Sequence, residues 1–130
     1  MATIKSYTDL EQSKKLAEIL PLESADMNWY ELPPIKLFIR AFPYKHDNGA
    51  TEGIYPCWSL AALLGVLPND EKKSTTLSRG GWKIETFEYL DKWWCEYEDE
   101  SHTKDFSVSA DNPVDACYEL ILKLNELKML

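Results

Sequence analysis

The chain has 130 residues and a formal net charge of −8 at pH 7, and its length fits a single domain over residues 1–130. The acidity argues against nucleic-acid binding, which needs a basic face, and no stretch has the length and apolarity of a membrane span or a signal peptide. The three cysteines are odd in number and widely spaced, which does not indicate a disulfide framework, so we expect a reduced, cytoplasmic protein.

The N-terminal part of the chain predicts an amphipathic helix. Thr8 and Glu11 have the spacing of a capping box, with Thr8 as the N-cap. An apolar stripe follows and stops at Pro21. The pattern therefore predicts a helix from about Asp9 to Leu20.

The next two elements are a strand and a second helix. Apolar and polar residues alternate over Ile35–Phe42, as in a strand with one buried face. Further on, Pro56 can occupy the first turn of a helix, where its missing N–H is not needed. The run Cys57–Leu64 is apolar nearly all round and ends near Gly65. It predicts a buried helix that begins at Pro56.

From Thr75 to Ser109 the apolar period changes to two, which predicts a meander of three or four antiparallel strands. One of these strands places Trp93, Cys95 and Tyr97 on one face and Trp94 and Glu96 on the other. The other expected strands are Thr75–Arg79, the segments around Trp82, Ile84, Phe87 and Tyr89, and a last strand marked by Phe106 and Val108.

The C-terminal segment predicts an amphipathic helix that begins at Asn112 and Pro113, with Asn112 as the N-cap. Its apolar residues recur at spacings of three and four and are Val114, Cys117, Leu120, Ile121, Leu124 and Leu127. Such a stripe needs an apolar surface beneath it. We therefore predict an α+β fold: a three- to four-stranded antiparallel meander with the amphipathic C-terminal helix packed on it, and two further helices.

Three stretches of the chain carry a family resemblance: Leu16–Met27, Pro56–Leu64 and Ala110–Leu124. Together they resemble a group of uncharacterised small proteins from gut Bacteroides-type bacteria, many of them carried on prophages or other mobile elements. The resemblance implies an origin on such an element. It implies no activity, because the group has no known activity or functional residues.

Cys57 is the candidate nucleophile. A thiol at the N-terminus of the predicted helix would have a lowered pKa, and Cys57-Trp-Ser-Leu-Ala61 locally resembles the stretch around the nucleophile of papain-like cysteine proteases. In a small cysteine-dependent hydrolase, His102 would be the base and Asp105 its orienting group. No flanking motif supports this triad, and a small cysteine on an apolar helix is usually a core residue. We therefore favour a non-catalytic role and keep the hydrolase as the alternative.

Five residues are candidate metal ligands by type: His46, Asp47, Cys57, Cys95 and His102. No pair among them has the close spacing of a zinc site. Histidines on the surface and cysteines in the core are the better account of these residues. We therefore expect no metal site and no cofactor.

A partner-binding site is predicted at Trp94, Glu96 and Glu98. Trp93 and Trp94 are adjacent, so in a strand they point to opposite faces: one can lie in the core, and the other lies on the outer side of the sheet or under another element. Packing in the core or under a helix is the commoner place for such a ring. An outward tryptophan is a suitable anchor for a protein partner, and the acidic segment Glu96–Asp105 is suitable for a basic one. We therefore expect a non-catalytic accessory or interaction protein with an exposed apolar patch. A third hypothesis is an acidic inhibitor of a nucleic-acid enzyme, which needs carboxylates spaced along one face like phosphates.

Overall fold

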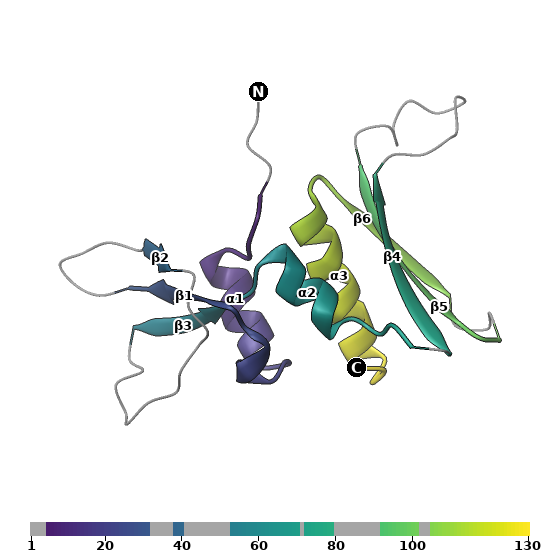
Figure 1. Ribbon diagram of the computed structural model, residues 1–130, viewed down its shortest axis with the longest axis horizontal. Helices are drawn as coiled ribbons and strands as arrows, with labels where there is room; N and C mark the ends of the chain where they lie inside the picture. Colours follow the sequence, from purple (N-terminus) through teal and green to yellow (C-terminus); the bar gives the residue numbers. More distant parts are fainter. Residues whose placement is uncertain (1–4, 32–37, 41–52, 71, 80–91, 102–104) are drawn as a thin grey trace. The chain divides into compact units, whose positions relative to one another are not determined.

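The structure is a computed structural model that describes residues 5–31, 38–40, 53–70, 72–79, 92–101 and 105–130. It divides into two compact units, Tyr7–Val66 and Leu67–Leu130, the second together with the segment that ends at Ser6. Each unit contains a three-stranded antiparallel sheet and at least one helix (Figure 1). The chain therefore has the α+β class that its sequence predicts, and the single domain over residues 1–130 stays a prediction.

The Tyr7–Val66 unit combines short helices with a sheet in the order β2-β1-β3. Both neighbours of the central strand run antiparallel to it, and Trp29 lies opposite Ile39 on one side and Tyr55 on the other. The elements in chain order are α1 (Leu10–Ala17), the 3₁₀ helix η1 (Leu22–Ser24), β1 (Met27–Tyr30), β2 (Phe38–Arg40), β3 (Ile54–Cys57) and α2 (Leu60–Val66).

Helix α1 begins one residue later than predicted. Its N-cap is Asp9, whose carboxylate accepts a hydrogen bond from the Gln12 amide at 2.8 Å, while the Gln12 side chain accepts one from the Asp9 amide at 3.1 Å. This is the reciprocal arrangement of a capping box. Thr8 is fully buried and uses its hydroxyl elsewhere, so the assignment of Thr8 as N-cap was wrong. The predicted end at Leu20 was also too late, because the helix ends at Ala17.

The middle helix was predicted too early in the chain. Pro56 and Cys57 belong to β3, where they lie opposite Asn28 and Met27, and α2 begins only at Leu60. A proline is compatible with this place because β3 is an edge strand among the described strands. The amide of Ala62 donates to the Ser59 hydroxyl at 3.2 Å, so the helix has a capping serine in place of the predicted proline.

The Leu67–Leu130 unit is the predicted meander, with strand order β4-β5-β6 and both pairs antiparallel. Its elements are β4 (Lys73–Arg79), β5 (Trp93–Asp99), β6 (Phe106–Ala110) and α3 (Pro113–Glu126). Helix α3 packs on β5 and β6 and so covers one face of the sheet (Figure 1). The strands predicted around Trp82, Ile84, Phe87 and Tyr89 lie outside the described residues, as do most of Ile35–Phe42 and the histidines His46 and His102.

The predicted start of α3 is confirmed. The Asn112 side chain accepts a hydrogen bond from the Asp115 amide at 2.8 Å, and Pro113 is the first helical residue. The apolar stripe is fully buried over Val114, Cys117, Leu120, Ile121 and Leu124. Leu127, the last predicted member of the stripe, is 41% exposed. The helix ends at Glu126, so the 3.6-residue period no longer directs the next side chain toward the sheet.

Candidate functional site

All three cysteines are free thiols with no exposed surface. Cys57 ends β3 in the Tyr7–Val66 unit, whereas Cys95 on β5 and Cys117 on α3 lie in the core of the Leu67–Leu130 unit. Free cysteines of this kind behave as small apolar residues. Each of them therefore packs the core. A buried thiol of this kind becomes a nucleophile only where its surroundings lower its pKa.

The net effect of its surroundings is to raise the pKa of Cys57. The residue lies in a strand, so the helix N-terminus that would have stabilised its thiolate is not there. Burial raises the pKa of the Cys57 thiol, and this outweighs the opposing hydrogen bonds from Thr8 and Ser13. The thiol donates to the Thr8 carbonyl at 3.3 Å. Cys57 is therefore a buried, neutral thiol, as the favoured interpretation of the sequence expects, and the activation that the hydrolase alternative requires receives no support.

The other two members of the hypothetical triad are not brought into a catalytic arrangement among the described residues. His102 lies outside them. Asp105 is exposed, and its carboxylate accepts a hydrogen bond from the Asp99 amide at 3.4 Å. A carboxylate that orients a catalytic histidine is normally buried against it. Asp105 is instead an exposed residue just before β6.

A thiol titration tests this description of the cysteines. We expect all three thiols of the native protein to react with an aromatic disulfide reagent at least about 100-fold more slowly than those of the urea-unfolded chain, because each must wait for local opening. The Cys57→Ala variant identifies which part of any fast signal belongs to Cys57. Rapid modification of Cys57 at pH 6 in the folded protein would contradict the assignment and restore the hydrolase hypothesis.

Thr8 is the centre of a buried hydrogen-bond network in the Tyr7–Val66 unit. Its hydroxyl lies 2.7 Å from the Ser13 hydroxyl and accepts from the Trp58 amide at 3.2 Å. Its carbonyl accepts from the Trp29 indole at 2.9 Å, and its amide donates to the Trp58 carbonyl at 3.0 Å. These contacts join the start of α1 to β1 and to the end of β3. The network therefore fixes the residue before the N-cap of α1 against the sheet of this unit and satisfies a buried hydroxyl.

A second link in this unit joins Asp26 to Ser59. The Asp26 carboxylate accepts from the Ser59 amide at 2.9 Å and from the Ser59 hydroxyl. The same hydroxyl caps α2. The carboxylate is thus used to fix the start of a helix, which accounts for it without a catalytic role.

The thiols of Cys95 and Cys117 interact with each other where α3 packs on β5. The hydrogen bond between them raises the pKa of Cys95 and lowers that of Cys117. Burial raises the pKa of both. The pair is covered from solvent on both sides, so it serves packing between helix and sheet.

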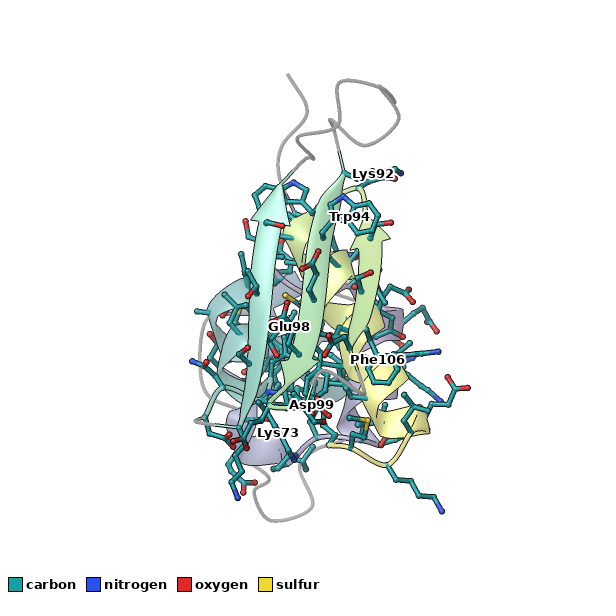
Figure 2. The ribbon with its side chains drawn as sticks, turned by 90° about the vertical axis from the view of Figure 1, so that its right-hand side faces the viewer. Lys73, Lys92, Trp94, Glu98, Asp99 and Phe106 are labelled. Carbon is teal, nitrogen blue, oxygen red and sulfur yellow. The ribbon has the colours of Figure 1, made fainter. Side chains whose placement is uncertain are left out.

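The face of the meander opposite α3 carries the predicted partner-binding residues. Strand β5 is central, and its side chains alternate: Cys95 and Tyr97 are buried under the helix, and Trp94, Glu96 and Glu98 occupy the other side. Figure 2 looks onto this side, with α3 behind the sheet. Glu98 is exposed, and Trp94 and Glu96 are half-buried.

The strand register adds two rows of small hydroxyl side chains to this face. On β4, Ser78 lies opposite Trp94, Thr76 opposite Glu96 and Ser74 opposite Glu98. On β6, Ser109 lies opposite Trp94 and Ser107 opposite Glu96. Directly opposite residues share a face. We call this surface the outer face, and its residues are Ser74, Thr76, Ser78, Trp94, Glu96, Glu98, Ser107 and Ser109.

The flanking hydroxyls were missed in the sequence. The signal was present as two alternating patterns, Ser74-Thr-Thr-Leu-Ser78 and Ser107-Val-Ser109. Which of these residues lie beside the carboxylates depends on strand register, a long-range property that no local pattern contains.

The two carboxylates of the outer face have no cation beside them in the described part of the chain. The described ion pairs join Lys5 to Asp115, Lys15 to Glu18 and Lys92 to Asp111, and none involves Glu96 or Glu98. Next to these glutamates is a small hollow of about 220 Å³, whose lining also includes Asp105, Phe106 and Ser107. The outer face therefore presents negative charge that the described neighbours do not neutralise.

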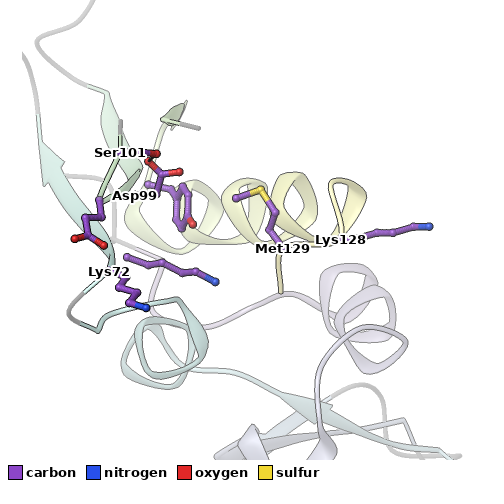
Figure 3. Close-up of a pocket in the computed structure, with 8 residues that line it drawn as sticks. Lys72, Asp99, Ser101, Lys128 and Met129 are labelled. Carbon is purple, nitrogen blue, oxygen red and sulfur yellow. Dashed lines mark hydrogen bonds between the residues drawn. The ribbon is translucent and has the colours of Figure 1, made fainter. Parts of the chain in front are cut away.

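A larger open pocket of about 600 Å³ lies where β4 begins and β5 ends. Its lining has both signs of charge, from Lys72 and Lys73 and from Asp99 and Glu100. Lys128 comes from the end of α3, and its side chain points away from Asp99 and Ser101 (Figure 3). These groups do not converge on one ligand, so the pocket indicates no ligand class.

Tyr97 lines both hollows and is almost fully buried. Burial raises the pKa of its phenol, and the nearby carboxylates of Asp99, Asp70 and Asp105 raise it further. Its ring stacks on Phe106 with the centroids 6.0 Å apart. At neutral pH the phenol keeps its proton and is unsuited to act as a base.

In the ranges that the structure describes, no three histidine, cysteine or acidic side chains gather as a metal site would require. Nor does any helix there have the length and apolarity needed to cross a membrane. Comparison of the chain with protein-family models, with curated proteins and with solved structures gave no match.

Proposed function

We propose that this chain is a non-catalytic interaction protein that binds a partner protein through the outer face. The observation that carries the proposal is the row of Trp94, Glu96 and Glu98 along the central strand, on the side of the sheet that α3 does not cover. Tryptophan is among the residues that contribute most to binding at protein interfaces. The full burial of Cys57 supports the non-catalytic interpretation over the hydrolase alternative.

The character of the outer face favours a polar, charged partner. An apolar patch was expected, but the large apolar side chains exposed in the described residues are Leu64, Leu127 and Leu130, none of which belongs to the outer face. The face instead combines one half-buried indole, two carboxylates and five hydroxyls. Complementary charge gives such an interface its specificity and fast association.

The acidic-inhibitor hypothesis receives less support from the same geometry. Strand alternation divides the acidic segment, with Glu96 and Glu98 on the outer face and Asp99 on the opposite side. Glu100 lies beyond the end of the strand. Two carboxylates on one face match a short stretch of the phosphates along a DNA strand, whereas the inhibitor hypothesis needs a longer row. The resemblance to mobile-element proteins supports a role on such an element for the interaction protein that we prefer. We propose a cytoplasmic setting for it.

A fragment-display selection with matched variants tests the proposal. Partners selected on the wild-type chain are expected to bind Trp94→Ala about 30-fold more weakly, which corresponds to an interface anchor worth about 2 kcal/mol. Glu98→Ala, at an exposed site that leaves the core intact, is expected to weaken them too. Leu130→Ala, at a residue 47% exposed, is the control. Selected partners that bind both outer-face variants as tightly as the wild type would overturn the proposal.

A further inference from the structure

The outer face has a regular spacing that points to the kind of partner. Trp94, Glu96 and Glu98 are alternate residues of one strand, so successive side chains stand about 6.7 Å apart. The positions beside them on β4 and β6 are serine or threonine at every register pair that the sheet contains. The larger central side chains therefore form a ridge between two rows of short ones.

The chemistry of this ridge is complementary to arginine. A carboxylate and a guanidinium can form two parallel hydrogen bonds, and the same planar group stacks on an indole. Lysine carries a compact charge and lacks the planar, forked donors of arginine, so it matches a carboxylate and an indole less well. Since no described cation neutralises Glu96 or Glu98, a partner's arginines would supply the missing charge.

The spacing also selects the conformation of the partner. An extended segment repeats its side chains on one side every two residues, at the same distance of about 6.7 Å as the ridge. Arginines at alternate positions of such a segment can therefore meet Glu96 and Glu98 together. The hollow of about 220 Å³ beside these two residues and Asp105 leaves space for one of the arginine head groups. The flanking hydroxyls can donate to or accept from the segment's backbone.

We propose that the outer face binds an extended segment of a partner protein with arginine at alternate positions, and this rests on the proposed function. Two of these arginines pair with Glu96 and Glu98, and a neighbouring arginine stacks on Trp94. Nucleic acid is not a candidate for this face because its phosphates would meet the carboxylates.

Fluorescence anisotropy with a labelled peptide tests the inference. The probe is acetyl-Gly-Arg-Ser-Arg-Ser-Arg-Gly-amide, and its binding is expected to weaken as salt is raised. The double variant Glu96→Gln, Glu98→Gln is expected to bind it about tenfold more weakly or worse, since each exposed ion pair contributes up to about fivefold. The matched control is Glu119→Gln, Glu126→Gln, which changes the net charge equally at two exposed residues of α3.

Two further peptides separate recognition from simple charge attraction. Citrulline in place of arginine keeps the shape without the charge and is expected to abolish binding. Arginine at every third position keeps the charge and is expected to bind more weakly, because its side chains leave the 6.7 Å register. Equal weakening by the α3 control variant, or equal binding of the re-spaced peptide, would overturn the inference. If the probe fails while selected partners still depend on Trp94, the inference is wrong and the proposed function stands.

Discussion

Replacing Leu120 with alanine is expected to lower the free energy of unfolding by about 2–5 kcal/mol. Leu120 is fully buried on the stripe of α3 that packs against β5 and β6. Truncating it removes apolar area from the core and leaves a cavity where helix and sheet meet. The expected loss is a large part of the total stability of a domain, which is about 5–15 kcal/mol.

Urea unfolding of the full chain, followed by far-UV circular dichroism, measures this loss. Leu127→Ala is the matched control, because the same change is made at the C-cap of the same helix, at a residue 41% exposed. We expect it to change the stability by no more than about 0.5 kcal/mol. Equal destabilisation by the two variants would mean that the described packing of α3 on the sheet is wrong.

Replacing Thr8 with valine is expected to destabilise the Tyr7–Val66 unit by about 2 kcal/mol or more. Valine has nearly the same shape as threonine but lacks the hydroxyl, so the Ser13 hydroxyl and the Trp58 amide lose a buried partner. Each buried polar group left without a hydrogen bond contributes about 1–3 kcal/mol to the loss. The effect comes from desolvation of the partners, since the core volume hardly changes.

The Thr8→Ser variant distinguishes the contribution of the hydroxyl to stability from that of the methyl group. It keeps the hydrogen bonds and removes one buried methyl, so we expect it to be clearly less destabilising than the valine variant. Hydrogen exchange at the Trp58 amide gives a local measurement, and protection there should fall with valine and be largely kept with serine. A serine variant as unstable as the valine variant would show that the methyl contact, and not the hydroxyl, holds Thr8.

The elements that the sequence predicted well depend on local patterns. Helix α3 has an N-cap asparagine, a proline and a five-residue buried stripe, and β5 has a two-residue alternation that already separates Cys95 and Tyr97 from Trp94 and Glu96. Both patterns are contained in fewer than fifteen consecutive residues. The α3-on-sheet arrangement follows from them, because each element has one apolar face to bury.

The errors arose where a local pattern had two solutions. The apolar run from Cys57 to Leu64 suits a buried strand end as well as a buried helix, and periodicity alone does not separate them. Two neighbouring residues, Thr8 and Asp9, could each cap α1. The long-range contact of Thr8 with Trp58 decides between them. The hydroxyl rows of the outer face required the register of three strands, which is equally non-local.

The Thr8 network has a consequence for the order in which this chain can fold during synthesis. Besides its nearer partners Ser13 and Trp29, Thr8 contacts Cys57 and Trp58, about fifty residues further along the chain. Asp26 contacts Ser59, about thirty residues further along. A nascent chain that ends before Cys57 can form the capping box of α1 and the contacts of Thr8 with Ser13 and Trp29. The contacts of Thr8 and Asp26 with residues 57–59 form only after that stretch has left the ribosome, so the start of α1 joins the end of β3 late in synthesis of this unit.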